Sequence, residues 1–126
     1  MELKEFKEED YSEICQWWTK RNFPCFPYEL LPKTGFVVPG LAAGFFYDSN
    51  NSLMGIVEWT VTNPDADKKL RQEALDQVIV HIINHARAQG KKFIITYSDN
   101  ESLIERYNKH GFVTADKNMT HLGRVI

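Results

Sequence analysis

The sequence predicts a single α/β domain built on a mixed sheet, and three observations support this. The chain has 126 residues, of which 43% are hydrophobic and 13% aromatic, so it can bury one sizeable core. Three strand-like segments joined by short turns lie between residues 35 and 62. A long amphipathic helical stretch and an apolar strand follow, and such a strand–helix–strand crossover is expected to be parallel.

The N-terminal part predicts a short edge strand, a helix and a hydrophobic loop. Residues 1–6 fit an edge strand, and Asp10 and Glu13 have the spacing of a capping box that opens a helix. The run 23–32 contains three prolines, so it cannot be one regular element, although residues 28–31 suit a helical turn. This loop either packs on the core or borders a substrate pocket, and the sequence leaves both interpretations open.

A meander of three antiparallel strands is predicted next, at residues 36–38, 41–48 and 53–62, because turn-forming residues separate them closely. Side chains alternate between the two faces of a regular strand. On the third strand this alternation places Val57, Trp59 and Val61 on the face of Gly55. The opposite face receives Ile56, Glu58 and Thr60.

The second half predicts two helices with a strand between them. Asn63 suits an N-cap and Pro64 the first helical position, so we expect the long helix to begin there and to end at Gly90. The apolar run 92–97 reads as a central, buried strand. Ser98 and Glu101 then have capping-box spacing for a helix over residues 99–110, and strands at 112–115 and 119–125 are expected to close the sheet.

Composition argues against several function classes without excluding them. A net charge of −2 gives no electrostatic footprint for a nucleic-acid backbone. There is no apolar run long enough to span a bilayer, and the charged N-terminus does not resemble a signal peptide, so a cytoplasmic protein is expected. In that compartment Cys15 and Cys25 are expected to be buried or half-buried free thiols, and a disulfide between them is the alternative. His81 and His85 lack the neighbouring carboxylate of a metalloprotease motif, so no metal site is predicted.

The run from residue 96 to residue 112 is the most specific motif of the chain. Its Asn100, Leu103, Tyr107, Gly111 and Phe112 stand at the spacing N-x-x-A-x-x-x-Y-x-x-x-G-F, with Leu103 in place of the small residue. This pattern, together with the element order, resembles the GNAT acyltransferases, which transfer an acetyl or related acyl group from coenzyme A to an amine. The resemblance implies a GNAT-like three-layer fold in which helices flank a mixed, mostly antiparallel central sheet.

The resemblance also implies roles for individual residues. Tyr107 matches the tyrosine that protonates the departing CoA thiolate, a transfer for which a phenol of pKa about 10 is suited. The alternative for Tyr107 is a core aromatic with a satisfied hydroxyl. Asn100 would order the turn or contact the pantetheine arm of acetyl-CoA. The backbone of Trp59, Thr60, Val61 and Thr62 would pair with the pantetheine amides.

A general base is harder to identify from the sequence. Glu58 is the one carboxylate inside a predicted central strand, so it is the candidate for deprotonating an amine. The alternative is an acid that faces solvent, and an amine that arrives neutral needs no base.

The sequence departs from the family where the CoA pyrophosphate is expected to bind. The glycine-rich signature Q/R-x-x-G-x-G/A, whose backbone amides reach the pyrophosphate at a helix N-terminus, is missing before the long helix. Lys69 and Arg71, with Lys68 beside them, could supply positive charge from side chains instead. The alternative is that these cations form an ordinary solvated helix face.

Two function classes therefore remain. The first is an acetyl-CoA-dependent N-acyltransferase with a small-molecule or protein amine as acceptor. The second is a non-catalytic GNAT-fold module that binds a protein or ligand. The chain is also similar, in its shortness and divergent cofactor loop, to acetyltransferase-like proteins of tailed bacteriophages. The exposed edge of the closing hairpin predicted at residues 112–125 makes a homodimer a further expectation.

Overall fold

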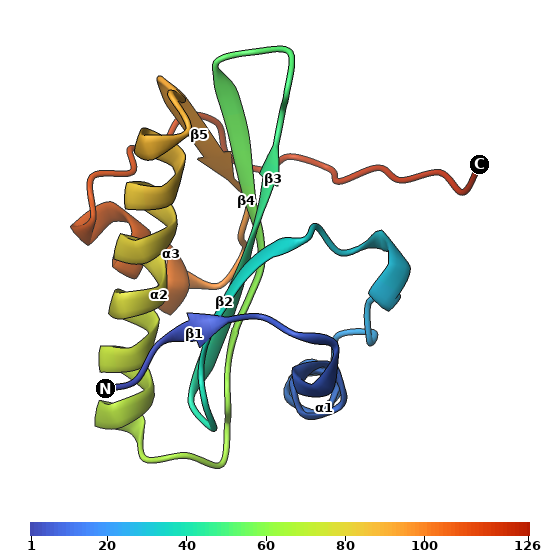
Figure 1. The fold of residues 1–126 in the computed structure, drawn as a ribbon, viewed down its shortest axis with the longest axis vertical. Coiled ribbons are helices and arrows are strands. Elements are labelled where there is room, and N and C mark those ends of the chain that lie inside the picture. The colour runs from blue at the N-terminus through green and yellow to red at the C-terminus, as the bar shows by residue number, and fades with distance from the viewer.

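The computed structural model describes residues 1–126 and places a five-stranded sheet at the centre of the chain (Figure 1). The strands lie side by side in chain order: β1 (Lys4–Glu5), β2 (Thr34–Val38), β3 (Ala42–Asp48), β4 (Met54–Thr62) and β5 (Phe93–Thr96). The first four strands are antiparallel to one another, and β5 is parallel to β4. The α/β class with a mixed, mostly antiparallel sheet is thus confirmed.

Helices cover both faces of this sheet, which gives three layers (Figure 1). The helix α1 (Tyr11–Lys20) lies on one face, and α2 (Lys68–Ala88) and α3 (Glu101–Lys109) lie on the other. Two short 3₁₀ turns, η1 (Glu8–Asp10) and η2 (Tyr28–Leu30), precede α1 and β2 respectively. No helix has the length and apolar character needed to cross a membrane.

Each face of the sheet carries its own hydrophobic core. The core under α2 and α3 includes Phe46, Val57, Ile82 and the aromatic ring of Tyr107. The core under α1 is rich in aromatic side chains, among them Trp17, Trp18 and Phe45. Side chains of β3 contribute to both cores, because consecutive side chains of a strand point to opposite faces. β3 is therefore buried on both sides and anchors the sheet.

The start of α2 differs from the prediction. Asn63 does not cap the helix: its side-chain oxygen accepts a hydrogen bond from the Asp65 amide at 2.9 Å, and its amide group donates to Gly40 O at 2.9 Å. Residues 63–67 form a loop instead, and Asp67 caps α2 by accepting from the Leu70 amide at 3.1 Å. The error arises because Asn63 and Asp67 are both good local caps, and only the long-range contact to Gly40 selects between them.

The two closing strands predicted at residues 112–115 and 119–125 are absent. Phe112 packs against the α2 core, but no backbone hydrogen bond joins residues 113–126 to the sheet. Val113 is 88% exposed and Leu122 84% exposed. Alternating apolar residues give only the capacity to form a strand, because a strand also needs a partner for its N–H and C=O groups. β5 is consequently an edge strand and not the central, buried strand expected.

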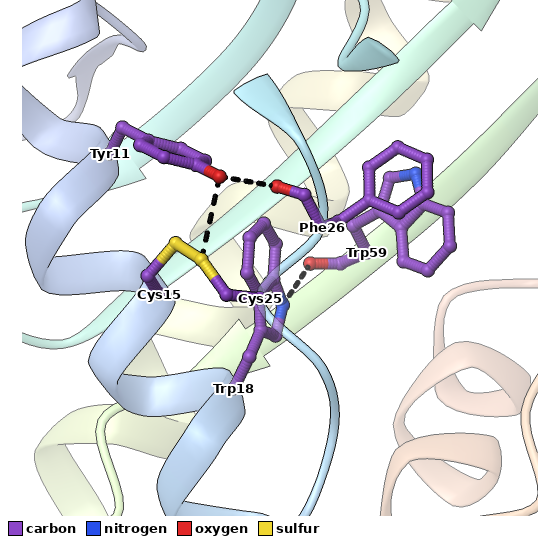
Figure 2. The surroundings of a disulfide bond; sticks show 6 residues. All are labelled: Tyr11, Cys15, Trp18, Cys25, Phe26 and Trp59. Carbon is purple, nitrogen blue, oxygen red and sulfur yellow. Dashed lines mark hydrogen bonds between the residues drawn. A yellow bond between two sulfur atoms is a disulfide. The ribbon is translucent and has the colours of Figure 1, made fainter. Parts of the chain in front are cut away.

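The expectation of two free thiols is also wrong, because Cys15 and Cys25 form a disulfide that ties α1 to the loop before η2 (Figure 2). The chain reverses direction directly after α1 at Asn22, which has a φ of 64°. This reversal returns Cys25 to the side of the helix, with the two Cα atoms 4.9 Å apart. The pairing depends on the turn, which composition and compartment arguments do not reveal.

Candidate active site

A bulge in β4 organises the candidate site. Between the pairs Ala43–Val61 and Phe45–Glu58 the register shifts, so two residues of β4 face one residue of β3, Gly44. Trp59 has a φ of 61°, in the left-handed region, as a bulged position often requires. A Cβ on Gly44 would lie 2.9 Å from Val78 and 3.4 Å from the Thr60 hydroxyl, so only glycine fits opposite the bulge.

The bulge changes which side chains share a face. Val57 and Thr60 lie on the face of α2 and α3, whereas Glu58 and Val61 lie on the face of α1. The predicted grouping of Val57, Trp59 and Val61 on one face is therefore wrong. It assumed strict alternation, and the extra residue at the bulge breaks that alternation.

β4 and β5 part at the level of the bulge. Their parallel pairing runs from Met54–Phe93 to Val57–Thr96 and stops there, where the Thr96 hydroxyl donates to Val57 O at 2.7 Å. Residues 58–62 of β4 therefore have no strand partner on the β5 side. This is the segment for which the sequence predicts contacts to pantetheine.

Two carbonyls of that predicted backbone segment are already engaged by α1 and the residue after it. Trp59 O accepts from the Trp18 indole at 3.3 Å, a contact drawn in Figure 2. Thr62 O and the Thr62 hydroxyl accept from the Arg21 guanidinium at 3.0 Å and 2.6 Å. The backbone groups of Thr60 and Val61 carry no such side-chain contact, so the free part of the segment is shorter than predicted.

Tyr107 lies in the core next to the bulge. Its ring is 3% exposed, and its hydroxyl shares a hydrogen bond of 2.6 Å with the Thr60 hydroxyl. Burial raises the pKa of Tyr107, while the hydroxyls of Thr60 and Thr96 favour its ionised form to a smaller extent. The phenol therefore keeps its proton at neutral pH, which is the protonation state that a general acid requires.

Glu58 lies on the other side of β4. It is partly buried, and its Oε1 atom is shielded from solvent without a hydrogen-bond partner. Burial raises the pKa of the Glu58 carboxyl, and the positive charge of His121 and the backbone amide of Tyr97 oppose that effect. The charge of Glu58 in turn raises the pKa of Tyr107, so the two groups sense each other electrostatically across the bulged strand.

A pocket of about 290 Å³ opens beside Glu58. Its other walls are mostly aromatic, and the full set of lining residues is Tyr47, Ile56, Glu58, Trp59, Tyr97 and His121. The Trp59 ring is held in place by Phe26, whose ring stacks on it with centroids 3.9 Å apart (Figure 2), and by its indole N–H, which donates to the Tyr47 hydroxyl at 2.9 Å. The loop before η2 thus contributes to the site through Phe26.

Asn100 has a structural role in the observed fold. Its side-chain oxygen caps α3 by accepting from the Leu103 amide at 3.0 Å. The Asn100 amide in turn donates to the Ser98 hydroxyl at 3.0 Å, so this pair orders the turn between β5 and α3. Of the two roles implied for Asn100, ordering the turn is the one that its contacts account for.

The two predicted phosphate contacts differ in their surroundings. Arg71 donates to Pro64 O at 3.1 Å and to Ala66 O at 2.9 Å, so its guanidinium holds the loop before α2. Lys69 is exposed and makes no hydrogen bond or ion pair. Burial lowers the pKa of Arg21, and the charge of Arg71 adds to this effect.

The N-terminus of α2 is not an open anion site. Asp67 occupies it with its own carboxylate, and Asp65 lies in the same loop, paired with Lys20. An anionic ligand would meet two carboxylates here and no glycine backbone. The predicted lack of a glycine cradle therefore remains, although a loop and not an early helix turn takes its place.

Another hollow, of about 340 Å³, lies along α2 and is lined by Leu3, Asp76 and His81 among others. It contains none of the predicted site residues. Its Asp76 carboxylate is already bonded to Arg106 at 3.0 Å and to His110 at 2.8 Å. We therefore place the candidate site at the bulge.

Comparison with known proteins supports the fold at low sequence identity. No protein-family profile matches the chain, and no curated protein sequence does. Among solved structures, a GNAT-family protein from Novosphingobium aromaticivorans matches with a TM-score of 0.67 and 16% identity over 90% of this chain and 52% of that one. Glucosamine-6-phosphate N-acetyltransferase from Arabidopsis thaliana matches with a TM-score of 0.70 and 12% identity over 96% and 97% of the two chains.

The chain has the GNAT acetyltransferase fold. A third match, N-acetylglutamate synthase from Neisseria gonorrhoeae in complex with coenzyme A and L-arginine, has a TM-score of 0.70 and 16% identity over 95% of this chain and 29% of that one. The TM-scores establish a shared fold, and identities this low do not establish a shared substrate. They lend no support to the resemblance to bacteriophage proteins.

Several residues of the site were not identified from the sequence. The sequence pattern assigns the Thr60 side chain to the face opposite Val57, whereas it lies on the same face. Tyr47, Tyr97 and His121 are not among the predicted site residues, and Phe26 is named only as part of the loop 23–32. Tyr97 could have been found, since it is the last residue of the predicted strand 92–97 and lies in the GNAT-like motif. The other positions depend on the bulge and on the path of the C-terminal segment, neither of which has a local sequence signal.

Proposed function

We propose that the protein is an acyltransferase that moves an acyl group from coenzyme A to an amine. The observation that carries this proposal is the bulge of β4, where the strand parts from β5 within a GNAT fold and the buried Tyr107 hydroxyl lies 2.6 Å from Thr60. A strand without a partner has free backbone groups that can pair with an amide-containing arm.

The surroundings of the bulge fit the thioester end of acyl-CoA, which supplies an activated acyl carbon and a thiol leaving group when bound. Tyr107 would hold a proton at its hydroxyl and release it toward a departing sulfur. Glu58, with a pKa raised by burial, would accept a proton from an ammonium group. The two residues stand on opposite sides of β4, which suits one of them to the leaving group and the other to the acceptor.

The N-terminus of α2 fits the phosphate end less well. Asp67 already caps it, and Arg71 is bonded to the loop carbonyls. We therefore derive no step from phosphate contacts, and Lys69 and Arg71 stay predictions as phosphate ligands. This misfit is the observation that favours the second candidate, a GNAT-fold binding module without turnover.

Removing the Tyr107 hydroxyl tests the first candidate. Tyr107→Phe keeps the buried ring, so the fold should persist while kcat for thiol release from acetyl-CoA, measured with a panel of primary amines, falls about 100-fold. Tyr28→Phe, in the loop on the α1 side, serves as the matched control and should retain full activity.

Binding of acetyl-CoA separates the two candidates. A ligand at 100 times its Kd stabilises the folded state by about 2.7 kcal/mol, which is readily seen as a rise in Tm. If millimolar acetyl-CoA leaves the Tm of the wild-type protein unchanged, the acyltransferase proposal is wrong and the binding module is favoured.

A further inference from the structure

The pocket beside Glu58 is lined by one carboxylate and by no permanently charged basic side chain. Neither lysine nor arginine lines it, and His121 is its only nitrogen base. A ligand with a carboxylate or phosphate would face Glu58 with His121 as the sole side chain able to balance its charge. The pocket therefore disfavours anionic ligands.

Glu58 also lacks the hydrogen bonds that a partly buried carboxylate needs. Its Oε1 atom is shielded from solvent and has no partner in the protein. Buried polar atoms without partners are rare in folded proteins and costly. A ligand cannot reach an atom that solvent does not reach, so a donor in the pocket would bond the other oxygen, Oε2, which is not fully shielded. A cationic donor satisfies both the hydrogen bond and the charge.

The aromatic walls favour the same ligand. Trp59, Tyr47 and Tyr97 surround Glu58, and aromatic ring faces attract cations through their quadrupoles. The Trp59 ring is fixed before any ligand arrives, because Phe26 stacks on it and Tyr47 accepts its indole N–H. The Tyr47 hydroxyl also donates to Leu30 O at 3.0 Å, so this tyrosine holds the wall in place and has no donor left for a ligand.

The size of the pocket limits the ligand. Its volume of about 290 Å³ is close to the lower end of the range for small-molecule sites. The walls are mostly apolar apart from Glu58 and His121, so the remainder of the ligand must be apolar or aromatic.

We propose that this pocket takes a small primary amine as its ammonium form, with an apolar or aromatic body and without any anionic group. Its ammonium group bonds Glu58, and its body packs between Trp59 and Tyr97. The assignment of this amine as the acyl acceptor rests on the function proposed above, whereas its binding does not.

A matched set of probes tests the pocket directly. The probes are 2-phenylethylamine, the neutral 2-phenylethanol, phenylalanine, which adds a carboxylate, and a short peptide with one lysine. Binding is followed by calorimetry and by the NMR signal of the Trp59 indole N–H, identified by its loss in Trp59→Phe. We expect 2-phenylethylamine to bind at least about 10-fold more tightly than each of the others, the worth of a charge-assisted hydrogen bond.

Variants then locate the interaction. Glu58→Gln should weaken 2-phenylethylamine about 10-fold or more and leave 2-phenylethanol unchanged. Tyr97→Ala should weaken the amine about two- to five-fold. Glu73→Gln, an exposed carboxylate on α2, is the control and should change neither affinity.

The outcomes separate this inference from the proposed function. Selective binding of the amine that depends on Glu58 supports the pocket assignment, and its acetylation by acetyl-CoA then decides the enzymatic role independently. Equal affinities for amine and alcohol, tighter binding of phenylalanine or of the lysine peptide, or unchanged selectivity in Glu58→Gln would each overturn the pocket assignment, even if acyl transfer to another amine is observed.

Discussion

At the scale of single residues, Glu58 is the proposed ligand-binding carboxylate and also a group that destabilises the fold. A carboxylate that is partly buried without a full set of hydrogen bonds destabilises the native state when it is charged. Binding and catalytic groups are commonly retained at such a cost, because the strained or unpaired group becomes satisfied only when a ligand arrives.

This cost predicts how stability depends on pH. The pKa of Glu58 is raised above its ordinary value of 4.5 by burial. The native state therefore keeps a proton that the unfolded state releases, and the free energy of unfolding falls as the pH rises from 4.5 through the folded-state pKa. Glu58→Gln removes this dependence, so its advantage over wild type should grow across that window and then level off.

The expected gain is small, because Glu58 is only partly buried. We expect Glu58→Gln to be about 0.5–1 kcal/mol more stable at neutral pH, or about 2–4 °C in Tm. The measurement is chemical unfolding between about pH 4 and pH 8, with Glu73→Gln as control. His121, Tyr47 and Tyr97 are the other titratable groups at this site. Parallel profiles for wild type and Glu58→Gln would contradict the prediction.

At the scale of elements, the sequence predicts what depends on local periodicity. The meander, α1 and α3 have clear alternating or helical patterns, and they form close to the expected residues. Asn100 and Tyr107 are placed by the same short-range logic, since one caps α3 and the other lies on its buried face. The bulge escapes prediction because Trp59 has no turn-forming character, and its φ of 61° depends on Gly44 in the neighbouring strand.

Arg71 illustrates how one side chain can belong to the fold or to a ligand. In this structure it bonds two carbonyls of the loop before α2. Arg71→Ala should therefore lower the free energy of unfolding by about 1–2 kcal/mol without any ligand present, because two loop carbonyls lose their donor. Lys69→Ala, two positions earlier and fully solvated, should leave the Tm unchanged.

Thermal unfolding of the two variants, with and without acetyl-CoA, checks this assignment. A normal Tm for ligand-free Arg71→Ala, together with a loss of the acetyl-CoA shift, would show that the guanidinium serves the phosphates and not the loop. The result also bears on the two interpretations of Arg71 that the sequence leaves open, a phosphate contact and a solvated helix face.

At the scale of the whole molecule, the sheet is open at both edges. β1 forms one edge with two residues, whereas β5 forms the other with four. The sequence alone does not decide whether the predicted closing strands form. Strand pairing depends on long-range contacts, which an alternating pattern does not contain. The C-terminal segment instead leaves α3 and extends past the sheet (Figure 1), with His121 at the pocket.

An open edge of this kind predicts self-association. Unpaired N–H and C=O groups along β5 form a template for another strand, and the edge carries exposed apolar side chains, with Phe93 64% and Tyr97 57% exposed. We therefore expect two copies to pair through β5 and form a continuous sheet, which would bury the edge and bring the two pockets near the dimer axis.

A charge placed at this edge is the sharpest test. Phe93→Lys should shift the protein to a monomer, because a lysine on an edge strand opposes pairing, while Val80→Lys on the exposed side of α2 should leave the dimer intact. Sedimentation velocity over micromolar to millimolar concentrations measures the change. A wild-type protein that stays monomeric throughout, or a Phe93→Lys variant that dimerises as well as wild type, would rule out pairing through β5.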